Sequence, residues 1–229
     1  MFTVRPSHER GHANRGWLES YHTFSFAEYH DPAHSHFRSL RVLNDDLVAA
    51  DTGFPTHPHR DMEIITHVLT GQLAHRDSMG NGATVKAGEW QYMSAGKGVQ
   101  HSEMNPAAEP VHLLQIWIVP DARGYEPRYD QKLFDTTPGR WTLAVSPDGR
   151  DGSIAIRQDA LILNAKVEPG SRLAYSLAEG RGGWLHMATG SATVSGIALN
   201  AGDAVGIENE EALEIVGAAP GEVILFDLA

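Results

Sequence analysis

Two short pairs of residues in this chain carry side chains that metal ions bind: His57-Pro58-His59 and His101-Ser102-Glu103. Side chains at positions i and i+2 of a β-strand point to the same face, so each pair can aim two ligands in one direction. If the two strands face each other across a barrel, three imidazoles and one carboxylate converge. Such a set of nitrogen and oxygen ligands binds one divalent transition metal, for example iron, nickel, copper, manganese, zinc or cobalt.

The segments that must position these ligands have the pattern of an all-β protein. Short apolar runs, such as residues 40–43, 111–119 and 222–226, are separated by turns rich in Gly, Pro, Asn and Asp. Apolar residues at helical spacing over more than about ten residues are scarce. The chain has 23 glycines and 12 prolines, which suit the many tight turns of a β-sandwich or barrel.

One order of elements occurs twice along the chain. A strand ending in glycine, an Ala-Gly-acid turn and a closing apolar strand are found in residues 68–119 and again in residues 187–226. This repeat predicts a duplicated β-barrel with a boundary near Pro138. We expect residues 1–138 to form a metal-binding barrel and residues 139–229 a degenerate barrel without metal ligands. The only histidine of the second half is His186, which we expect to be packed or at the surface.

Composition excludes several classes of function. The formal net charge of −11 opposes direct binding of nucleic acid, because phosphates would be repelled. The chain has no cysteine, so any metal must be bound through nitrogen and oxygen. No apolar stretch reaches the roughly 18 residues that suggest a membrane span, and residues 1–10 lack the pattern of a signal peptide. We therefore expect a cytoplasmic protein that binds no membrane.

The residues around both ligand pairs resemble the cupin superfamily and, within it, the pirin family. The two cupin motifs correspond here to Gly53, His57, His59, Glu63 and Gly71, and to Gly88, Gly96, His101 and Asn105. Residues 57–64, 77–80 and 94–103 resemble pirins more specifically, as do residues 16–27 and 40–46. The second cupin motif usually has a proline where this chain has Ser94. The resemblance is dense over about residues 10 to 120 and implies a bicupin, with two jelly-roll β-barrels in tandem and few short helices.

Two glutamates are candidates for the fourth metal ligand. In cupins generally the glutamate of the first motif, here Glu63, is often the ligand, whereas in pirins it is the residue corresponding to Glu103. The i+2 spacing from His101 also favours Glu103, because Glu63 lies about 13 Å from His59 along an extended strand. The predicted ligands are therefore His57, His59, His101 and Glu103. We assign Glu63 to a contact behind the ligands or with the substrate.

The resemblance implies a pirin-like, metal-dependent dioxygenase of the quercetin 2,3-dioxygenase type. Such an enzyme cleaves a small aromatic substrate, a flavonol such as quercetin, with O2, and Glu103 would act as the general base. Iron is the expected metal. If the metal is octahedral, four protein ligands leave two positions open, whereas a tetrahedral site would be closed, as in structural zinc sites.

The sequence leaves two non-enzymatic alternatives open. One is a regulatory protein that senses the redox state of iron and acts through protein partners, as implied for some pirins. The other is a barrel stabilised by structural zinc. A substrate-sized opening beside the metal would favour the enzyme. We also expect a monomer, because a duplicated barrel buries internally the surface that single-barrel cupins bury by dimerisation.

The remaining histidines receive less specific interpretations. A second His-x-His, formed by His34 and His36, lies among turn residues and is interpreted as a loop. His112 begins an apolar strand and is expected to be structural. His67 and His75 could line the pocket, but solvent-facing strand positions are favoured for both.

Overall fold

The computed structural model describes residues 1–229, which form two compact units. The N-terminal unit consists of Gly11–Leu133 together with Ile156–Gln158. The C-terminal unit consists of Met1–Arg10, Phe134–Ala155 and Asp159–Ala229. No helix of the structure is both long and apolar enough to cross a membrane.

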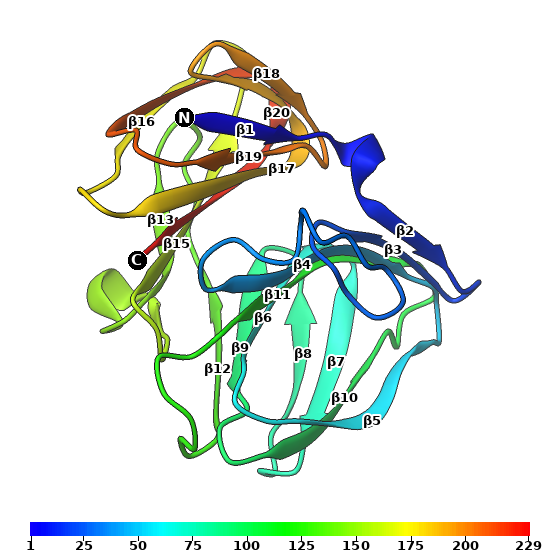
Figure 1. The fold of residues 1–229 in the computed structure, drawn as a ribbon. Helices are drawn as coiled ribbons and strands as arrows, with labels where there is room; N and C mark the ends of the chain where they lie inside the picture. Colours follow the sequence, from blue (N-terminus) through cyan, green and yellow to red (C-terminus); the bar gives the residue numbers. More distant parts are fainter. The chain divides into compact units, whose positions relative to one another are not determined.

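The N-terminal unit is built from two antiparallel sheets (Figure 1). The larger sheet has the strand order β12-β9-β6-β11-β4-β3-β2, and the smaller has the order β5-β10-β7-β8. The strands of the larger sheet are β2 (Gly11–Asn14), β3 (Leu18–His22), β4 (Leu40–Val48), β6 (Glu63–Thr70), β9 (Glu89–Ser94), β11 (Val111–Ile118) and β12 (Arg128–Leu133). Those of the smaller sheet are β5 (Gly53–His59), β7 (Gln72–Asp77), β8 (Gly82–Lys86) and β10 (Val99–Met104).

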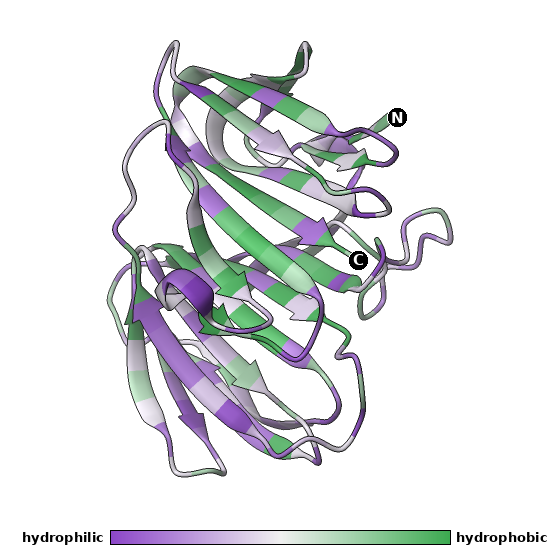
Figure 2. Ribbon diagram, turned by 90° about the vertical axis from the view of Figure 1, so that its left-hand side faces the viewer, coloured by the Kyte–Doolittle hydropathy of each residue, from purple (hydrophilic) through white to green (hydrophobic).

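The period-two pattern of the strands decides which side chains face the interior of this unit. In β10, Val99, His101 and Glu103 are buried, whereas the alternate positions are exposed or half-buried. Figure 2 shows the same alternation as bands of hydrophobic and hydrophilic colour along single strands. Most strands bury apolar residues, and two clusters form around Val68 and Val111 and around Ile64 and Met93. The buried positions of β10 differ because two of them are potential metal ligands.

Gly53 permits a close approach between β5 and β10. Its φ of 156° is one that side-chain-bearing residues rarely adopt. A Cβ atom at this position would lie 2.2 Å from the backbone oxygen of Glu103 and 2.6 Å from Cα of Met104. The pairing of the two strands also shifts register between His101 and Glu103, where β5 contains an extra residue. Gly53 therefore lets these irregular strands bring their polar side chains together.

The C-terminal unit contains one nine-stranded sheet. Its strands are β1 (Phe2–Arg5), β13 (Thr142–Ser146), β14 (Ile154–Ala155), β15 (Ala160–Val167), β16 (Arg172–Ser176), β17 (Gly182–Val194), β18 (Ile197–Asn200), β19 (Ala204–Ile207) and β20 (Ala212–Leu228). The interior is a single large apolar cluster that includes Leu163, Leu185, Met187, Val205 and Leu225. Strand β1 pairs antiparallel with β19, and Phe2 packs against this cluster.

The all-β prediction with few short helices is confirmed. The helices are two 3₁₀ turns, η1 (Ser7–Glu9) and η2 (Arg150–Gly152). The structure divides the chain at places other than the single boundary expected after residue 138. The first ten residues belong to the C-terminal unit because β1 adds to its sheet, and residues 156–158 belong to the N-terminal unit. Spacing along the sequence did not reveal either exchange, since both depend on pairing between distant segments.

Candidate metal centre

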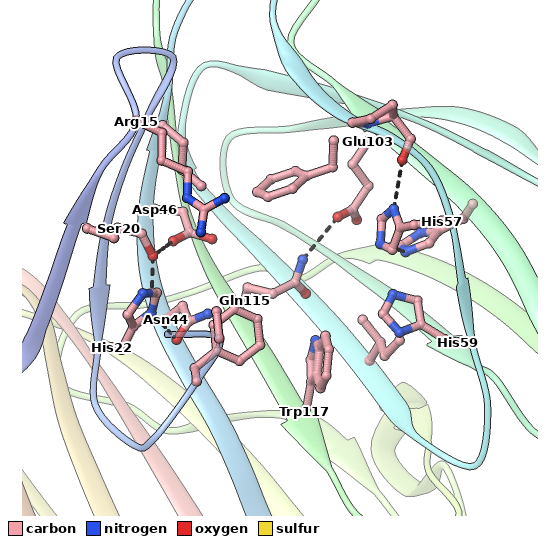
Figure 3. A pocket seen from close by; sticks show the side chains of 18 of the residues that line it. Arg15, Ser20, His22, Asn44, Asp46, His57, His59, Glu103, Gln115 and Trp117 are labelled. Atoms are coloured by element: carbon pink, nitrogen blue, oxygen red, sulfur yellow. Dashed lines mark hydrogen bonds between the residues drawn. The ribbon is translucent and has the colours of Figure 1, made fainter. Parts of the chain in front are cut away.

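A cavity of about 360 Å³ in the N-terminal unit is lined by residues of both sheets. All four predicted ligands, His57, His59, His101 and Glu103, contribute to its lining. Figure 3 shows the imidazoles of His57 and His59 and the carboxylate of Glu103 together on one side of this cavity. The volume is in the range of small-molecule sites, which is about 300–1,000 Å³.

The three predicted histidine ligands converge as the strand argument requires. Ligand atoms of His57, His59 and His101 all lie within 4.8 Å of one another. His57 and His101 are directly opposite in the β5–β10 pairing, and their Nε2 atoms are 3.0 Å apart. Two ligand nitrogens at metal bonds of about 2.0–2.1 Å have nearly this separation when the bonds are at right angles. The spacing of the imidazoles therefore fits a shared cation.

Local hydrogen bonding sets which nitrogen of His57 is available. Its Nδ1 lies 2.8 Å from the backbone oxygen of Pro55. A carbonyl oxygen only accepts, so Nδ1 carries a proton in this contact, and Nε2 is the nitrogen that faces His101. A backbone carbonyl that orients a histidine in this way is a common feature of metal sites, because it fixes both the tautomer and the direction of the ring.

His59 and His101 are held neutral, which metal binding requires. Burial, together with charge repulsion from the neighbouring imidazoles of His101 and His57, lowers the pKa of His59 to about 4. Burial likewise lowers the pKa of His101 to about 3, with contributions from His57 and His75. Both rings are therefore unprotonated at neutral pH, and a metal need not displace a proton from them.

Glu103 is a buried carboxylate without a cationic partner. It is 2% exposed and accepts hydrogen bonds from three neutral side chains. Gln91 Nε2 donates to Oε1 at 2.8 Å, Thr66 Oγ1 donates to the same oxygen at 3.3 Å, and Gln115 Nε2 donates to Oε2 at 3.0 Å. Neutral donors alone compensate a buried charge poorly, so a cation at this position would stabilise the carboxylate. The ligand atoms of Glu103 group with those of His101 and His75, whereas His57 and His59 form a separate group with His101, so a cation shared by all four predicted ligands would lie close to His101.

Glu63 takes no part in this cluster, and its expected contact with ligands or substrate is not found. It begins β6, beyond the turn that ends β5, so it does not lie on the same strand as His59. Its neighbour Ile64 lines the cavity, whereas Glu63 points to the other face of the sheet. There it accepts hydrogen bonds from Tyr92, from Ser94 at 2.6 Å and from the backbone nitrogen of Arg157 at 3.1 Å. Glu63 therefore ties residues 156–158 to this unit.

Comparison with known proteins agrees with this fold. The pirin family model matches residues 3–118, and a quercetinase C-terminal cupin domain model matches residues 143–228. The chain is 47% identical to a quercetin 2,3-dioxygenase of Escherichia coli K12, covering all of this chain and 99% of that protein. The chain belongs to the pirin family.

Solved structures place the whole chain in the same fold. The crystal structure of YhhW from Escherichia coli matches with a TM-score of 0.97 at 46% identity, covering 100% of this chain and 98% of the other. A second structure, of the bacterial pirin YhhW in complex with nickel(II), matches with a TM-score of 0.96 at 45% identity, covering 100% and 99% of the two chains. The expected bicupin fold of a pirin is confirmed.

The other histidines of this pirin separate into two groups. His34 lies in a loop, as expected, and His112 forms a hydrogen bond with Asp45, with 2.6 Å between Nε2 and Oδ1. The solvent-facing interpretation of His67 and His75 is wrong, because both are buried. His67 stacks on Trp90, whereas ligand atoms of His75 lie within 4.8 Å of those of His101 and Glu103. His75 is thus a close neighbour of the centre that the sequence argument did not identify.

A second polar cluster of this pirin lines the same cavity and was missed by the sequence argument. Figure 3 shows Ser20, His22, Asn44 and Asp46 on the side opposite His57 and His59, with Gln115 between the two groups. In the pairing of β3 with β4, Ser20 is opposite Asp46 and His22 is opposite Asn44. The i+2 rule could have placed Ser20 with His22 and Asn44 with Asp46 on common faces, but only the pairing of β3 with β4 brings the two pairs together.

Proposed function

We propose that this pirin is a metal-dependent dioxygenase that cleaves flavonols, such as quercetin, with O2. The observation that supports this most directly is the position of three imidazoles and a buried carboxyl group without a cationic partner in the wall of one cavity. The relation to a quercetin 2,3-dioxygenase over the full length of the chain gives independent support.

The proposed metal ligands are His57, His59, His101 and Glu103. Iron is the proposed native metal, although nickel also fits nitrogen and oxygen donors and is present in a related pirin structure. When bound, the metal would supply Lewis acidity to an oxygen of the substrate. Pro55 orients His57 through its carbonyl, and Gln91, Thr66 and Gln115 hold the carboxylate of Glu103 toward the cavity.

Glu103 is the proposed general base for the 3-hydroxyl of the flavonol. Its Oε2 accepts a hydrogen bond from Gln115, and its Oε1 accepts one from Gln91. The single hydroxyl proton of Thr66 is shared between Oε1 of Glu103, at 3.3 Å, and Oε1 of Gln115, at 3.2 Å. The position of the base therefore depends on this shared network.

Aromatic side chains line the cavity, and their flat surfaces suit a planar substrate. Trp117 makes edge-to-face contacts with His59 and Phe26, at ring-centroid distances of 5.0 and 5.4 Å. Trp17 and Phe54 form a second such pair at 5.2 Å. A roomy cavity beside the ligands favours catalysis over a structural metal site or a purely regulatory one, since neither of these needs space for a small molecule.

The test is oxygen uptake with quercetin, using protein whose metal content has been measured. Uptake is expected in proportion to bound metal and should be lost after chelation. Glu103→Gln should abolish turnover while weakening metal binding only partially, because the amide can still ligate through oxygen but cannot accept the proton. Gln100→Glu, on the outward face of the same strand, is the control for a charge change near the site and should leave uptake unaffected.

Two outcomes would contradict the proposal. Fully metallated protein that consumes no oxygen would redirect the search to a regulatory role, to be followed by isolation of protein partners. Wild-type turnover in Glu103→Gln would exclude Glu103 as the base while leaving the dioxygenase activity in place.

A further inference from the structure

We propose that Ser20, His22, Asn44 and Asp46 form a second binding subsite, which recognises a hydroxyl group of the substrate remote from the ring that reacts. The inference rests on the proposed function and narrows its substrate class to planar polyphenols that carry hydroxyl groups at both ends. Such a molecule would lie between two sides of the cavity (Figure 3). One is the histidine wall, formed by His57, His59 and His101, and the other is the polar wall, formed by the four residues of the subsite.

The geometry of Asp46 is the first support for this subsite. The residue is 3% exposed and lines the cavity, so what little surface it retains faces the place where a substrate would lie. Its Oδ1 accepts a hydrogen bond from Ser20 Oγ, and its Oδ2 takes part in none. No lysine or arginine forms a salt bridge with it. A buried carboxyl with an unused oxygen directed into a cavity is a strong site for a phenolic hydroxyl.

Burial raises the pKa of Asp46 to about 7, with the hydrogen bond from Ser20 opposing the shift and the charges of Asp45 and Glu103 adding to it. The carboxyl can therefore act in either protonation state near neutral pH. As a carboxylate it accepts from a phenol, and as an acid it donates to a phenol oxygen.

His22 and Asn44, which are opposite each other in the β3–β4 pairing, form a hydrogen-bonded pair within the subsite. His22 Nδ1 lies 2.9 Å from Oδ1 of Asn44 and 3.3 Å from Oγ of Ser20. Because an amide oxygen only accepts, Nδ1 of His22 carries the proton in this contact. Cross-strand pairing fixes all four side chains on rigid backbone, so the cluster is preorganised and not assembled by the ligand.

The metal centre does not account for this second cluster. None of its four residues belongs to either group of potential metal ligands, and no hydrogen bond joins them to His57, His59 or His101. A polar network with an unsatisfied carboxyl oxygen is costly inside a cavity whose other walls are aromatic, unless a ligand completes it. The chemistry therefore points to a hydroxylated edge of a planar ligand.

The experiment compares two flavonols with the metal-loaded protein: quercetin, which carries hydroxyl groups on its outer rings, and 3-hydroxyflavone, which has only the hydroxyl of the reacting ring. Oxygen-uptake kinetics give KM and kcat, and titration calorimetry gives Kd for both. For Asp46→Asn and Ser20→Ala we expect Kd and KM for quercetin to rise about tenfold, in line with loss of a hydrogen bond to a charged group. The values for 3-hydroxyflavone should change less than about twofold.

Asp45→Asn is the matched control. It removes the same charge one residue away, but Asp45 points to the opposite face of β4, where it pairs with His112. It should leave the preference for quercetin intact. Thermal melting of each variant shows that the fold is retained, and Ser20→Ala tests the subsite without altering a charge.

The outcomes separate this inference from the proposed function. Oxygen uptake with both flavonols, but equal Kd for the two in the wild type, overturns the subsite and leaves the dioxygenase standing. A parallel loss of affinity for both ligands in Asp46→Asn also overturns it. Absence of uptake with either compound contradicts the proposed function, while the calorimetric preference for quercetin and its loss in Asp46→Asn would still support the subsite.

Discussion

The two units of this pirin fill their interiors in different ways. The C-terminal unit packs leucine, valine, isoleucine and methionine into one large cluster. The N-terminal unit buries a comparable sheet framework but places Asp46, Thr66, Gln91, His101 and Glu103 inside it. The apolar interior gains free energy from burial alone, whereas each polar group in the other must find a partner or lower its stability.

This difference in buried residues indicates that the N-terminal unit gives up some stability for function, whereas the C-terminal unit does not. Burying Glu103 and Asp46 in an apolar barrel is unfavourable unless a cation or a ligand compensates the carboxyl groups. In the C-terminal unit the buried carboxyl group of Asp227 is compensated by an ion pair with Arg181, and neither group of potential metal ligands lies in this unit. One unit thus serves as a stable framework, and the other tolerates a destabilising interior that can bind and react.

The largest expected effect comes from His101→Ala. Loss of one of three converging imidazoles should lower bound metal and oxygen uptake by at least about a hundredfold. Elemental analysis and oxygen-electrode assays check this, and His36→Ala, on an exposed loop, serves as the histidine control. Retention of full metal content in His101→Ala would remove the main distinction drawn between the two interiors.

The converse variant is Leu225→Ala in the C-terminal unit. Leu225 is fully buried in the apolar cluster, so truncation should lower the free energy of unfolding by about 2–5 kcal/mol. Metal content per folded molecule should stay the same. Chemical denaturation followed by circular dichroism measures the first quantity, and elemental analysis the second. A loss of metal without a loss of stability would contradict the view that the C-terminal interior serves stability and the N-terminal interior serves metal binding.

A smaller effect is expected from Asp46→Asn on the pH dependence of stability. The folded pKa of about 7 lies above the ordinary value of 3.8, so the folded protein retains a proton that the unfolded chain releases between these limits. Stability from this group is therefore present below about pH 4 and lost as pH rises toward 7. Relative to the wild type, the variant should gain on the order of 1–3 kcal/mol between pH 5 and pH 8. Parallel pH profiles for the two proteins would contradict the assignment.

The opposite pH trend is expected from the histidine wall of the metal-free protein. The folded pKa values of His59 and His101, about 4 and about 3, lie below that of a free imidazole. As pH falls below about 6.5, the unfolded chain binds protons that the folded protein does not, so stability decreases toward pH 4. Thermal melts of metal-free protein across this range measure the trend, and His59→Ala should make it shallower.

Much of the metal centre could be predicted from the sequence because strand periodicity is local. The i+2 rule placed His57 with His59 and His101 with Glu103 on common faces, and the structure brings the three imidazoles together. The same rule misled for Glu63, because a turn with Asp61 in a left-handed conformation separates it from β5 and puts it on another sheet. The rule that residues i and i+2 share a face applies only within one strand.

The polar wall could not be predicted in the same way because it depends on pairing. Ser20 and Asp46 are separated by a long loop, and only the register of β3 against β4 makes them neighbours. The division into units was missed for a similar reason. Sequence patterns reported that strands exist, but the partners of β1 and of residues 156–158 are set by tertiary contacts.

The pairing of β1 with β19 has a consequence for biosynthesis. Residues 2–5 are made before their partner, residues 204–207, which follows about 200 residues later in the chain. At about 5–20 residues per second, this first strand waits roughly 10 to 40 s without its partner. The segment Gly11–Leu133 emerges within that interval, so the catalytic barrel can begin to close co-translationally while the framework barrel is still incomplete.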